Sequence, residues 1–288
     1  MQSIHYRAPV SIDEAVSLLG EDADARVFAG GTDLLVQVRS GLHRPSAWVD
    51  IKRIPELMRL EVEADEVCIG AAVTCAEIVE NAEIQRRLPG VSEAIDLIGS
   101  TQVQGRATLG GNLCNASPAA DSVPALIAAR ALCVIAGPGG ERVIPTEELA
   151  AGPGESTLGR GELLVSVRIP TPPPRSGDAY LRMIPRTDLD IAVAGAGVAL
   201  TFAEDGTCSA ARVVIGAVAP TALLVSEAAA ALVGSRVHDA ALEAVAQAAS
   251  AAACPINDKR GTIAYRKKVV GVLAKRAAAL AASRVQES

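Results

Sequence analysis

The chain has 288 residues, of which 50% are hydrophobic and 21% charged, a composition that excludes a disordered protein and allows one large or two ordinary domains. Its formal net charge of −6 gives no electrostatic reason to expect nucleic acid or an anionic membrane surface as a partner. The N-terminus lacks a basic region followed by an apolar one, and no window reaches 18 uninterrupted apolar residues, so we expect a cytoplasmic protein with no integral membrane segment.

The first half of the chain mixes predicted helices and strands without strict alternation, with a glycine pair near its start. Ser11 and Glu14 have the spacing of a capping box, which predicts a short helix after Ser11. Residues 25–28 predict a strand that leads into Gly30 and Gly31, and residues 34–38 predict a short helix. Further strands are expected at residues 47–51, 67–70 and 132–135, and further helices after a second capping box at residues 74–77, at 91–98 and at 124–131.

A proline-rich stretch at residues 170–174 divides the chain, because consecutive prolines neither continue a helix nor pair in a central strand. We therefore predict one domain at residues 1–172 and a second at 175–288. After the stretch, strands are expected at residues 179–184, 191–202 and 208–218, the last two forming a hairpin, and helices at 223–232, 239–253 and 262–282.

Two similar glycine-rich segments are the main candidates for a binding site. The first glycine segment, residues 29–34, reads AGGTDL, and the second glycine segment, residues 108–112, reads TLGGN. Each places paired glycines beside a hydroxyl residue, so bare backbone N–H groups can approach an anion such as a diphosphate. The alternative is a pair of tight turns. Asp121 could accept hydrogen bonds from a ribose, or it could be a carboxylate at a helix N-terminus.

Other ligand sites find little support in the sequence. No GxGxxG enters a helix near the N-terminus and no GxxxxGK[ST] occurs, which excludes Rossmann and P-loop sites. The six cysteines show no CxxC and no histidine at metal-ligand spacing. We therefore expect no metal or iron–sulfur cluster on this chain. Cys114, which closely follows the second glycine segment, is expected to be a small packing residue.

With residues 116–121, ASPAAD, the two glycine segments closely resemble the FAD-binding medium subunit of the molybdenum hydroxylases, the xanthine dehydrogenase and carbon monoxide dehydrogenase group. The resemblance covers nearly the whole chain and includes residues 6–11 (YRAPVS), 190–192 (DIA), 215–221 (IGAVAPT) and 265–266 (YR). It implies an α+β fold: a PCMH-type FAD-binding domain of two α+β subdomains, then a C-terminal α+β domain with an antiparallel sheet and helices of the carbon monoxide dehydrogenase flavoprotein type.

The resemblance also implies which residues bind FAD. The two glycine segments would wrap the diphosphate, Asp121 would bind the ribityl or nucleotide part, Leu164 would contact the cofactor, and Ile191 would approach the flavin ring. Arg182 stands where the family commonly has a lysine near the flavin. The full set expected to bind FAD is Arg26, Val27, Phe28, Ala29, Gly30, Gly31, Thr32, Asp33, Leu34, Thr108, Leu109, Gly110, Gly111, Asn112, Ser117, Asp121, Leu164, Arg182 and Ile191, with no catalytic and no metal-binding residue.

Two further departures from the family pattern lie outside this set. At residues 102–106 (QVQGR), glutamine and glycine replace an Arg-Asn pair that is common before the second glycine segment. No cysteine-bearing insertion is present, unlike in the benzoyl-CoA reductase branch, which adds a four-iron cluster to this subunit.

The function implied is electron transfer. The flavin would take electrons one at a time from an iron–sulfur centre of a partner and pass them to an external acceptor. The implied partners are a large subunit with a molybdopterin cofactor and a small subunit with two two-iron clusters, assembled as a dimer of heterotrimers. Two alternatives remain open: a stand-alone PCMH-type flavoprotein oxidase, and a FAD-free paralogue that acts as a scaffold.

Overall fold

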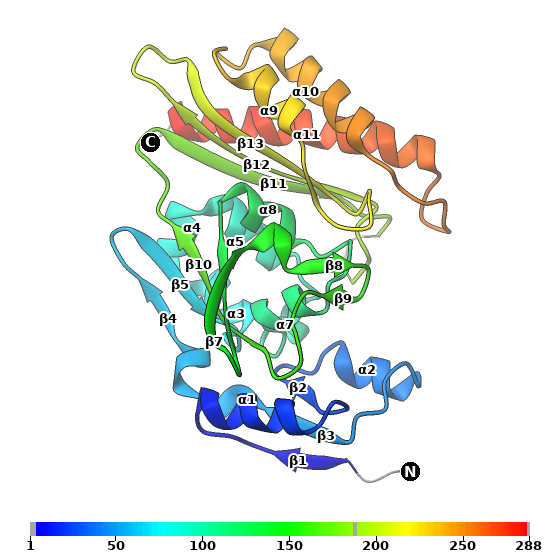
Figure 1. Cartoon of the computed structure of the whole chain (residues 1–288). Coiled ribbons are helices and arrows are strands. Elements are labelled where there is room, and N and C mark those ends of the chain that lie inside the picture. Colours follow the sequence, from blue (N-terminus) through cyan, green and yellow to red (C-terminus); the bar gives the residue numbers. More distant parts are fainter. Residues whose placement is uncertain (1–3, 187–188, 287–288) are drawn as a thin grey trace.

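The structure, a computed structural model, describes residues 4–186 and 189–286. It has three layers of structure stacked along its length, which run from blue through green to red in Figure 1. The helices and antiparallel sheets confirm the predicted α+β class. Within the described residues, no helix is long and apolar enough to cross a membrane.

The N-terminal part contains a small parallel sheet. Its strands β1 (His5–Arg7), β3 (Ala47–Asp50) and β2 (Arg26–Phe28) lie in that order. Helix α1 (Ile12–Glu21) packs its buried Ala15 and Leu19 into the local core, and the Ser11 side chain caps it by accepting from the Glu14 N–H, as predicted. Helix α2 (Leu34–Arg39) follows the first glycine segment and has no buried residue.

A five-stranded antiparallel sheet forms the centre of the molecule. Its order is β4 (Leu60–Val62), β5 (Glu66–Gly70), β10 (Leu163–Pro170), β6 (Leu132–Gly137) and β7 (Gly140–Pro145). Because β10 lies between β5 and β6, the central strand of this sheet is the last of the five in sequence, and helices α3 to α8 come before it in the chain. The remaining elements are α3 (Cys75–Glu80), α4 (Ala82–Arg87), α5 (Pro89–Asp96), α6 (Thr101–Gln104), α7 (Leu109–Cys114), α8 (Ser122–Ala128), β8 (Ala150–Gly152) and β9 (Glu155–Ser156).

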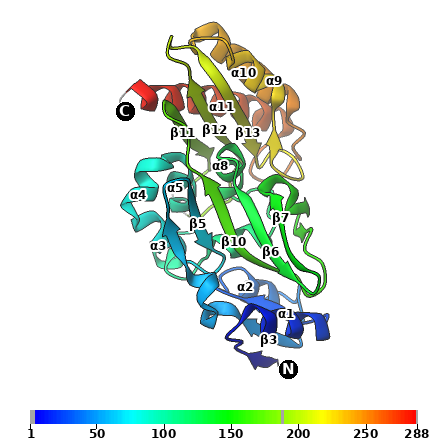
Figure 2. The same ribbon diagram turned by 60° about the vertical axis from the view of Figure 1, so that its left-hand side comes forward.

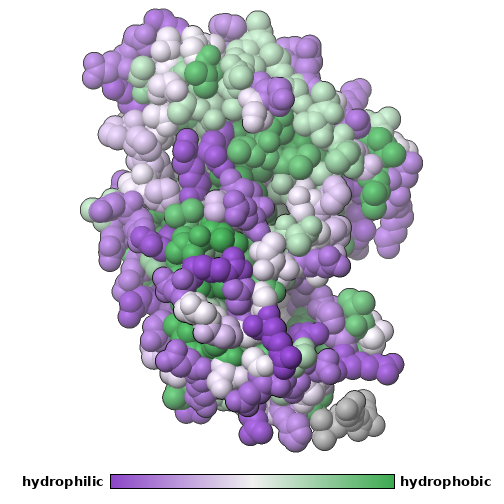
Figure 3. Space-filling view, in the orientation of Figure 1, coloured by the Kyte–Doolittle hydropathy of each residue, from purple (hydrophilic) through white to green (hydrophobic). Residues whose placement is uncertain are grey.

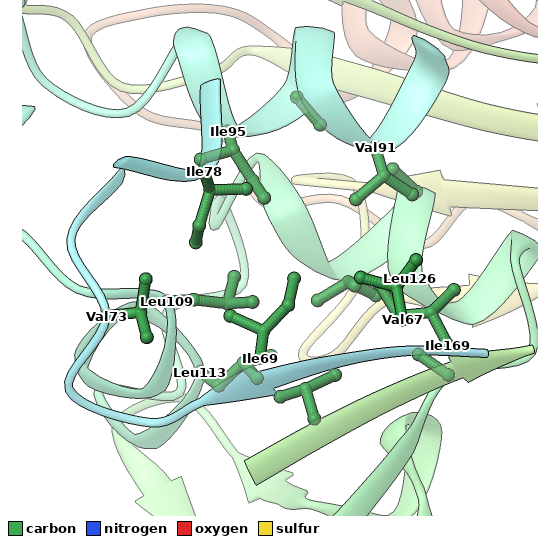
Figure 4. Close-up of a cluster of buried hydrophobic side chains, with 14 of the residues drawn as sticks. Val67, Ile69, Val73, Ile78, Val91, Ile95, Leu109, Leu113, Leu126 and Ile169 are labelled. Carbon is green, nitrogen blue, oxygen red and sulfur yellow. The ribbon is translucent and has the colours of Figure 1, made fainter. Parts of the chain in front are cut away.

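The largest apolar core lies between this sheet and its helices. Figure 4 shows Ile69 of β5 beside Leu109 and Leu113 of α7, and Ile169 of β10 on the other side of the cluster, near Leu126 of α8. Leu109 is fully buried and Leu113 is nearly so. The core therefore anchors α7, which carries the second glycine segment.

The C-terminal part is an antiparallel sheet between two layers of helices. Its strands are β11 (Ser176–Met183), β12 (Ala194–Phe202), β13 (Cys208–Gly216) and β14 (Leu223–Leu224), and its helices are α9 (Ser226–Leu232), α10 (Asp239–Ala252) and α11 (Ile263–Gln286). The predicted hairpin of β12 and β13 is confirmed. In Figures 1 and 2, α9, α10 and α11 cover one face, while α8 lies against the other.

Some predicted boundaries were wrong. Strand β12 begins at Ala194 and not at residue 191, and residues 223–224 pair as β14 before α9 begins at Ser226.

Glycines make the close packing of α8 on β12 and β13 possible, since a Cβ at Gly197 would lie 2.6 Å from the Pro124 carbonyl oxygen. The placement of a domain boundary at residues 172–175 stays a prediction.

Candidate functional site

The first glycine segment follows β2 at an edge where ligands commonly bind. β2 and β3 run parallel with Phe28 opposite Asp50, so the segments after both strands emerge at the same edge. Gly31 has a φ of +71°, a left-handed conformation that favours glycine. A Cβ there would also lie 2.7 Å from the Phe28 ring.

Backbone donors in the first glycine segment are free. Among the described residues, no acceptor is found for the N–H groups of Gly30, Gly31 and Thr32. Successive backbone N–H groups next to a left-handed residue form a concave nest that binds anions. The segment can therefore donate to a phosphate group without any rearrangement of existing hydrogen bonds.

The second glycine segment is the first turn of helix α7, not a loop. Thr108 is the N-cap, and its Oγ1 accepts from the Gly111 N–H at 3.1 Å. The Gly110 N–H donates to the Ala71 carbonyl at 3.1 Å, and the Asn112 N–H donates to the Thr108 carbonyl at 3.0 Å. The free donors expected here are thus already engaged, because Thr108 and the Ala71 carbonyl accept from them.

The two glycines of this second segment have different roles. A Cβ at Gly110 would lie 2.5 Å from the Ala71 carbonyl oxygen, so Gly110 is required by packing. Gly111 is exposed, and a Cβ there would meet only the Thr108 hydroxyl. Gly111 therefore leaves an open surface to which another molecule can come close.

The structure brings the two segments together. A Cβ built at Gly30 would lie 1.9 Å from the Arg106 carbonyl oxygen, so this glycine packs directly against the residues that lead into α7. Gln37 of α2 also donates through Nε2 to Asn115 Oδ1 at 2.8 Å. The free donors of the first segment and the open surface of the second thus lie on neighbouring pieces of chain.

Asp121 and Arg182 form a buried ion pair next to α7. Arg182 Nη1 lies 2.6 Å from Asp121 Oδ2, and the Tyr180 hydroxyl donates to Oδ1 at 2.8 Å. Burial raises the pKa of the Asp121 carboxyl, and Arg182 and Tyr180 counteract that shift. Asp121 is the N-cap residue of α8, so the alternative of a carboxylate at a helix N-terminus describes its position, although its side chain makes no capping hydrogen bond.

This ion pair joins the central and C-terminal parts of the molecule. Arg182 and Tyr180 lie on β11, whereas Ser122, which follows Asp121, donates to Asn112 Oδ1 at 2.6 Å. The predicted residues Asn112, Asp121 and Arg182 are therefore linked by one continuous set of contacts.

Other predicted residues lie around this arrangement in different ways. Leu164 is 2% exposed and packs in the central core, while the Ala71 N–H bonds to the adjacent Val165 carbonyl at 2.8 Å. The Leu164 side chain thus supports the second glycine segment from behind. Ile191 is 52% exposed in the connection from β11 to β12. Ser117 accepts from the Ala119 N–H and lines a small hollow between α7, β8 and residues 220–222.

Some residues of the range 26–34 are held by contacts within the protein, and others are exposed. Arg26 donates to the carbonyls of Ala23 and Ala25, so its guanidinium holds its own turn. Val27 and Phe28 are half-buried in β2, and Thr32 and Asp33 are exposed. Local desolvation nevertheless raises the pKa of the Asp33 carboxyl.

Lys52 was missed by the sequence interpretation. It follows β3, and its Nζ donates to the Ala29 carbonyl at 2.9 Å, within the first glycine segment. The signal that could have identified it is the parallel pairing of β2 and β3, which was not predicted and which places the residues after both strands together.

Two of the thiol groups are held in their protonated form by burial. Burial raises the pKa of Cys114 and of Cys75 to about 12, so both are protonated at neutral pH. In the part of the chain that the structure describes, no group of three or more His, Cys, Asp or Glu side chains could hold a metal ion.

Most of the chain matches two protein families. The FAD binding domain in molybdopterin dehydrogenase matches residues 2–172, and the CO dehydrogenase flavoprotein C-terminal domain matches residues 179–281. The carbon monoxide dehydrogenase medium chain of Hydrogenophaga pseudoflava is 35% identical over 273 residues, which cover 94% of each chain.

Solved structures have the same fold. A carbon monoxide dehydrogenase from Hydrogenophaga pseudoflava that lacks the Mo-pyranopterin moiety of its molybdenum cofactor matches with a TM-score of 0.93 and 36% identity, over 98% of both chains. Quinoline 2-oxidoreductase from Pseudomonas putida 86 matches with a TM-score of 0.91 and 28% identity, over 98% of this chain and 97% of that one. The resemblance read from the glycine segments is confirmed.

Proposed function

This chain belongs to the FAD-binding subunits of the molybdenum hydroxylases, and from that premise we propose that it relays electrons from an iron–sulfur cluster of a partner subunit to an external acceptor. Such subunits are parts of oxidoreductases, and FAD is the cofactor. When bound, FAD supplies the redox chemistry, and the protein supplies binding and orientation. The observation that carries the proposal is the packing of Gly30, which begins the run of free donors, against Arg106 and Ala107, which lead into the helix that carries Gly111.

The residues present fit the diphosphate of FAD. A diphosphate needs several donors and no neighbouring side chains, and the N–H groups of Gly30, Gly31 and Thr32 meet the first condition. Gly111 meets the second, because its exposed face carries no side chain. We assign Thr108 and Gly110 to the support of this surface, and Asn112 and Ser117 to its rim.

Arg182 and Asp121 are assigned a role beside the flavin part of FAD. Arg182 keeps the positive charge that the family commonly carries as lysine, but its guanidinium is fixed by Asp121. Because the pair links β11 to the start of α8, it would hold the C-terminal part in register with the FAD site. Ile191 would then present its exposed apolar side chain toward the ring.

The partners are proposed to be a large molybdopterin subunit and a small iron–sulfur subunit, in a dimer of heterotrimers. Relatives are described as medium chains and as subunits of dehydrogenase complexes. A surface feature supports this assignment, since Leu35, Val36 and Leu42 on and after α2 are 43%, 62% and 69% exposed. Apolar side chains also show on the surface in this region in Figure 3, and such patches commonly mark protein contacts.

The proposal is tested by isolating the chain with and without its native partners. We expect the purified chain to bind FAD, to show no oxidase activity alone, and to co-purify from its natural host with two further subunits that contain molybdenum and iron. A chain that binds no FAD would contradict the proposal and favour a scaffold. Substrate oxidation by the isolated flavoprotein would favour a stand-alone oxidase.

A further inference from the structure

The Lys52 ammonium group is held next to the first glycine segment by several contacts. Its Nζ donates to the Ala29 carbonyl at 2.9 Å and to Asp50 Oδ1 at 2.7 Å, and lies 4.6 Å from the centre of the Phe28 ring. These contacts hold a flexible side chain in one place. Fixing a lysine side chain costs conformational entropy, and here the contacts with Ala29, Asp50 and Phe28 offset that cost.

Asp50 is itself held as an ionised anchor. Its side chain is 8% exposed, and its second oxygen accepts from the Tyr6 hydroxyl at 2.5 Å. Burial alone would raise the pKa of Asp50, but the hydrogen bonds from Lys52 and Tyr6 outweigh it and hold that pKa below its usual value. Asp50 therefore remains a carboxylate at neutral pH and keeps the Lys52 ammonium in position.

One donor of the ammonium group is left over. A lysine has three N–H donors, and among the described residues only the Ala29 carbonyl and Asp50 accept from Lys52. The side chain is 33% exposed, so the group is open on one side. The only other apparent partner, the Phe28 ring, accepts through its face and takes no conventional hydrogen bond.

The topology places this donor at the edge where the cofactor is proposed to bind. β2 leads into Gly30 and Gly31, β3 leads into Lys52, and the two strands are parallel neighbours. The bond to Ala29 puts the ammonium next to the residue that precedes the free N–H groups. We propose that Lys52 is a further FAD-binding residue, which donates its remaining N–H to the diphosphate and fixes the first glycine segment through Ala29.

This inference rests on the proposed FAD site and adds a charged donor to it. Backbone N–H groups carry only partial charge, whereas a charge-assisted hydrogen bond from an ammonium to a phosphate is shorter and stronger. The adjacent Arg53 offers a matched control. It is exposed, carries the same charge, and makes no hydrogen bond or ion pair with any residue that the structure describes.

The test compares FAD binding by the full chain and by its K52M, K52R and R53M variants. FAD affinity is measured by flavin fluorescence, and ADP, which has the diphosphate but no flavin, is used as a competitor. We expect K52M to weaken FAD and ADP binding by the same factor, roughly 10- to 100-fold for the loss of one charge-assisted bond. R53M should leave both within about twofold, and K52R should recover part of the loss.

Circular dichroism and thermal unfolding check that each variant is folded. Equal FAD affinity in K52M and the wild-type chain would overturn the inference, and so would a loss for FAD without any loss for ADP. No recovery in K52R would also contradict it. Failure of the wild-type chain to bind FAD would instead contradict the proposed function itself, so the two failures are distinguishable.

Discussion

The α-carbon of Gly30 lies against the carbonyl oxygen of Arg106, with no room for a side chain between them. This contact joins the segment after β2 to the residues that lead into α7, although the elements from α2 to α6 lie between the two in the sequence. Because backbone meets backbone, neither side can yield by a change of rotamer. The geometry of the proposed FAD site therefore depends on a contact that only glycine permits.

Replacement of Gly30 by alanine should separate the two glycine segments. The new Cβ would lie 1.9 Å from the Arg106 oxygen, so one segment must move. We expect FAD affinity to fall by roughly 10- to 100-fold, as for the loss of one charge-assisted hydrogen bond. Fluorescence titration measures the change. G105A is the control, because Gly105 is a neighbouring glycine with nothing within 4 Å of its added Cβ, and a similar loss there would refute the argument.

Gly110 and Gly111 should respond differently to substitution. G110A places a methyl group 2.5 Å from the Ala71 oxygen, and overpacking of this kind destabilises by about 1–3 kcal/mol. G111L adds a side chain on the exposed surface, so the free energy of unfolding should change by less than about 1 kcal/mol while FAD retention is lost. Urea unfolding and flavin content separate the two effects. Normal flavin content in folded G111L would show that this surface does not face the cofactor.

The sequence predicted the elements whose signals are local. The capping box at Thr74 and Glu77 is present with both of its hydrogen bonds, and the predicted hairpin of β12 and β13 forms. The short strands β1, β4 and β7 were missed, because three to six residues with few buried side chains carry little pattern. Strand β10 was not predicted either, and its pairing partners β5 and β6 are distant in the chain.

The sequence pointed to segments for the candidate site but not to the hydrogen bonds that those segments make. The resemblance pointed to both glycine segments, and in the structure Gly30 of the first packs against Arg106 and Ala107, directly before the second. It could not show that the N–H groups of the second segment are used within α7, because that depends on the Thr108 cap and on Ala71. Lys52 escaped notice because a single lysine after a strand is ordinary until its neighbour strand is known.

Removal of Arg182 alone from the Arg182–Asp121 ion pair should lower the free energy of unfolding. R182M leaves the Asp121 carboxylate buried without its partner, and such changes destabilise by about 3–5 kcal/mol. D121N/R182M should recover much of this loss, since an amide oxygen can still accept from Tyr180. Because removal of Arg182 takes away a contact that lowers the pKa of Asp121, the defect should be smaller at pH 5 than at pH 8. Chemical unfolding at both pH values measures this. A double variant as unstable as R182M would contradict the pairwise explanation.

Asp178 should make the stability of the protein depend on pH. It lies on β11 and accepts from the Gly90 N–H of α5 at 3.1 Å, close to Arg284 and Glu93, and burial raises its pKa to about 6. Between pH 4 and 6 the folded chain therefore keeps a proton that the unfolded chain has lost, so the free energy of unfolding falls as pH rises through this window and levels off above it.

The expected difference is roughly 3 kcal/mol for a shift of about two pH units. D178N cannot titrate, so its unfolding free energy, measured in urea from pH 4 to 8, should lack this part of the slope. E56Q, at an exposed carboxyl of the same chain, should keep the wild-type slope. A slope in D178N equal to that of the wild-type chain would place the pH dependence in other groups, and Asp178 would then be ionised in the folded protein with Arg284 as its compensating charge.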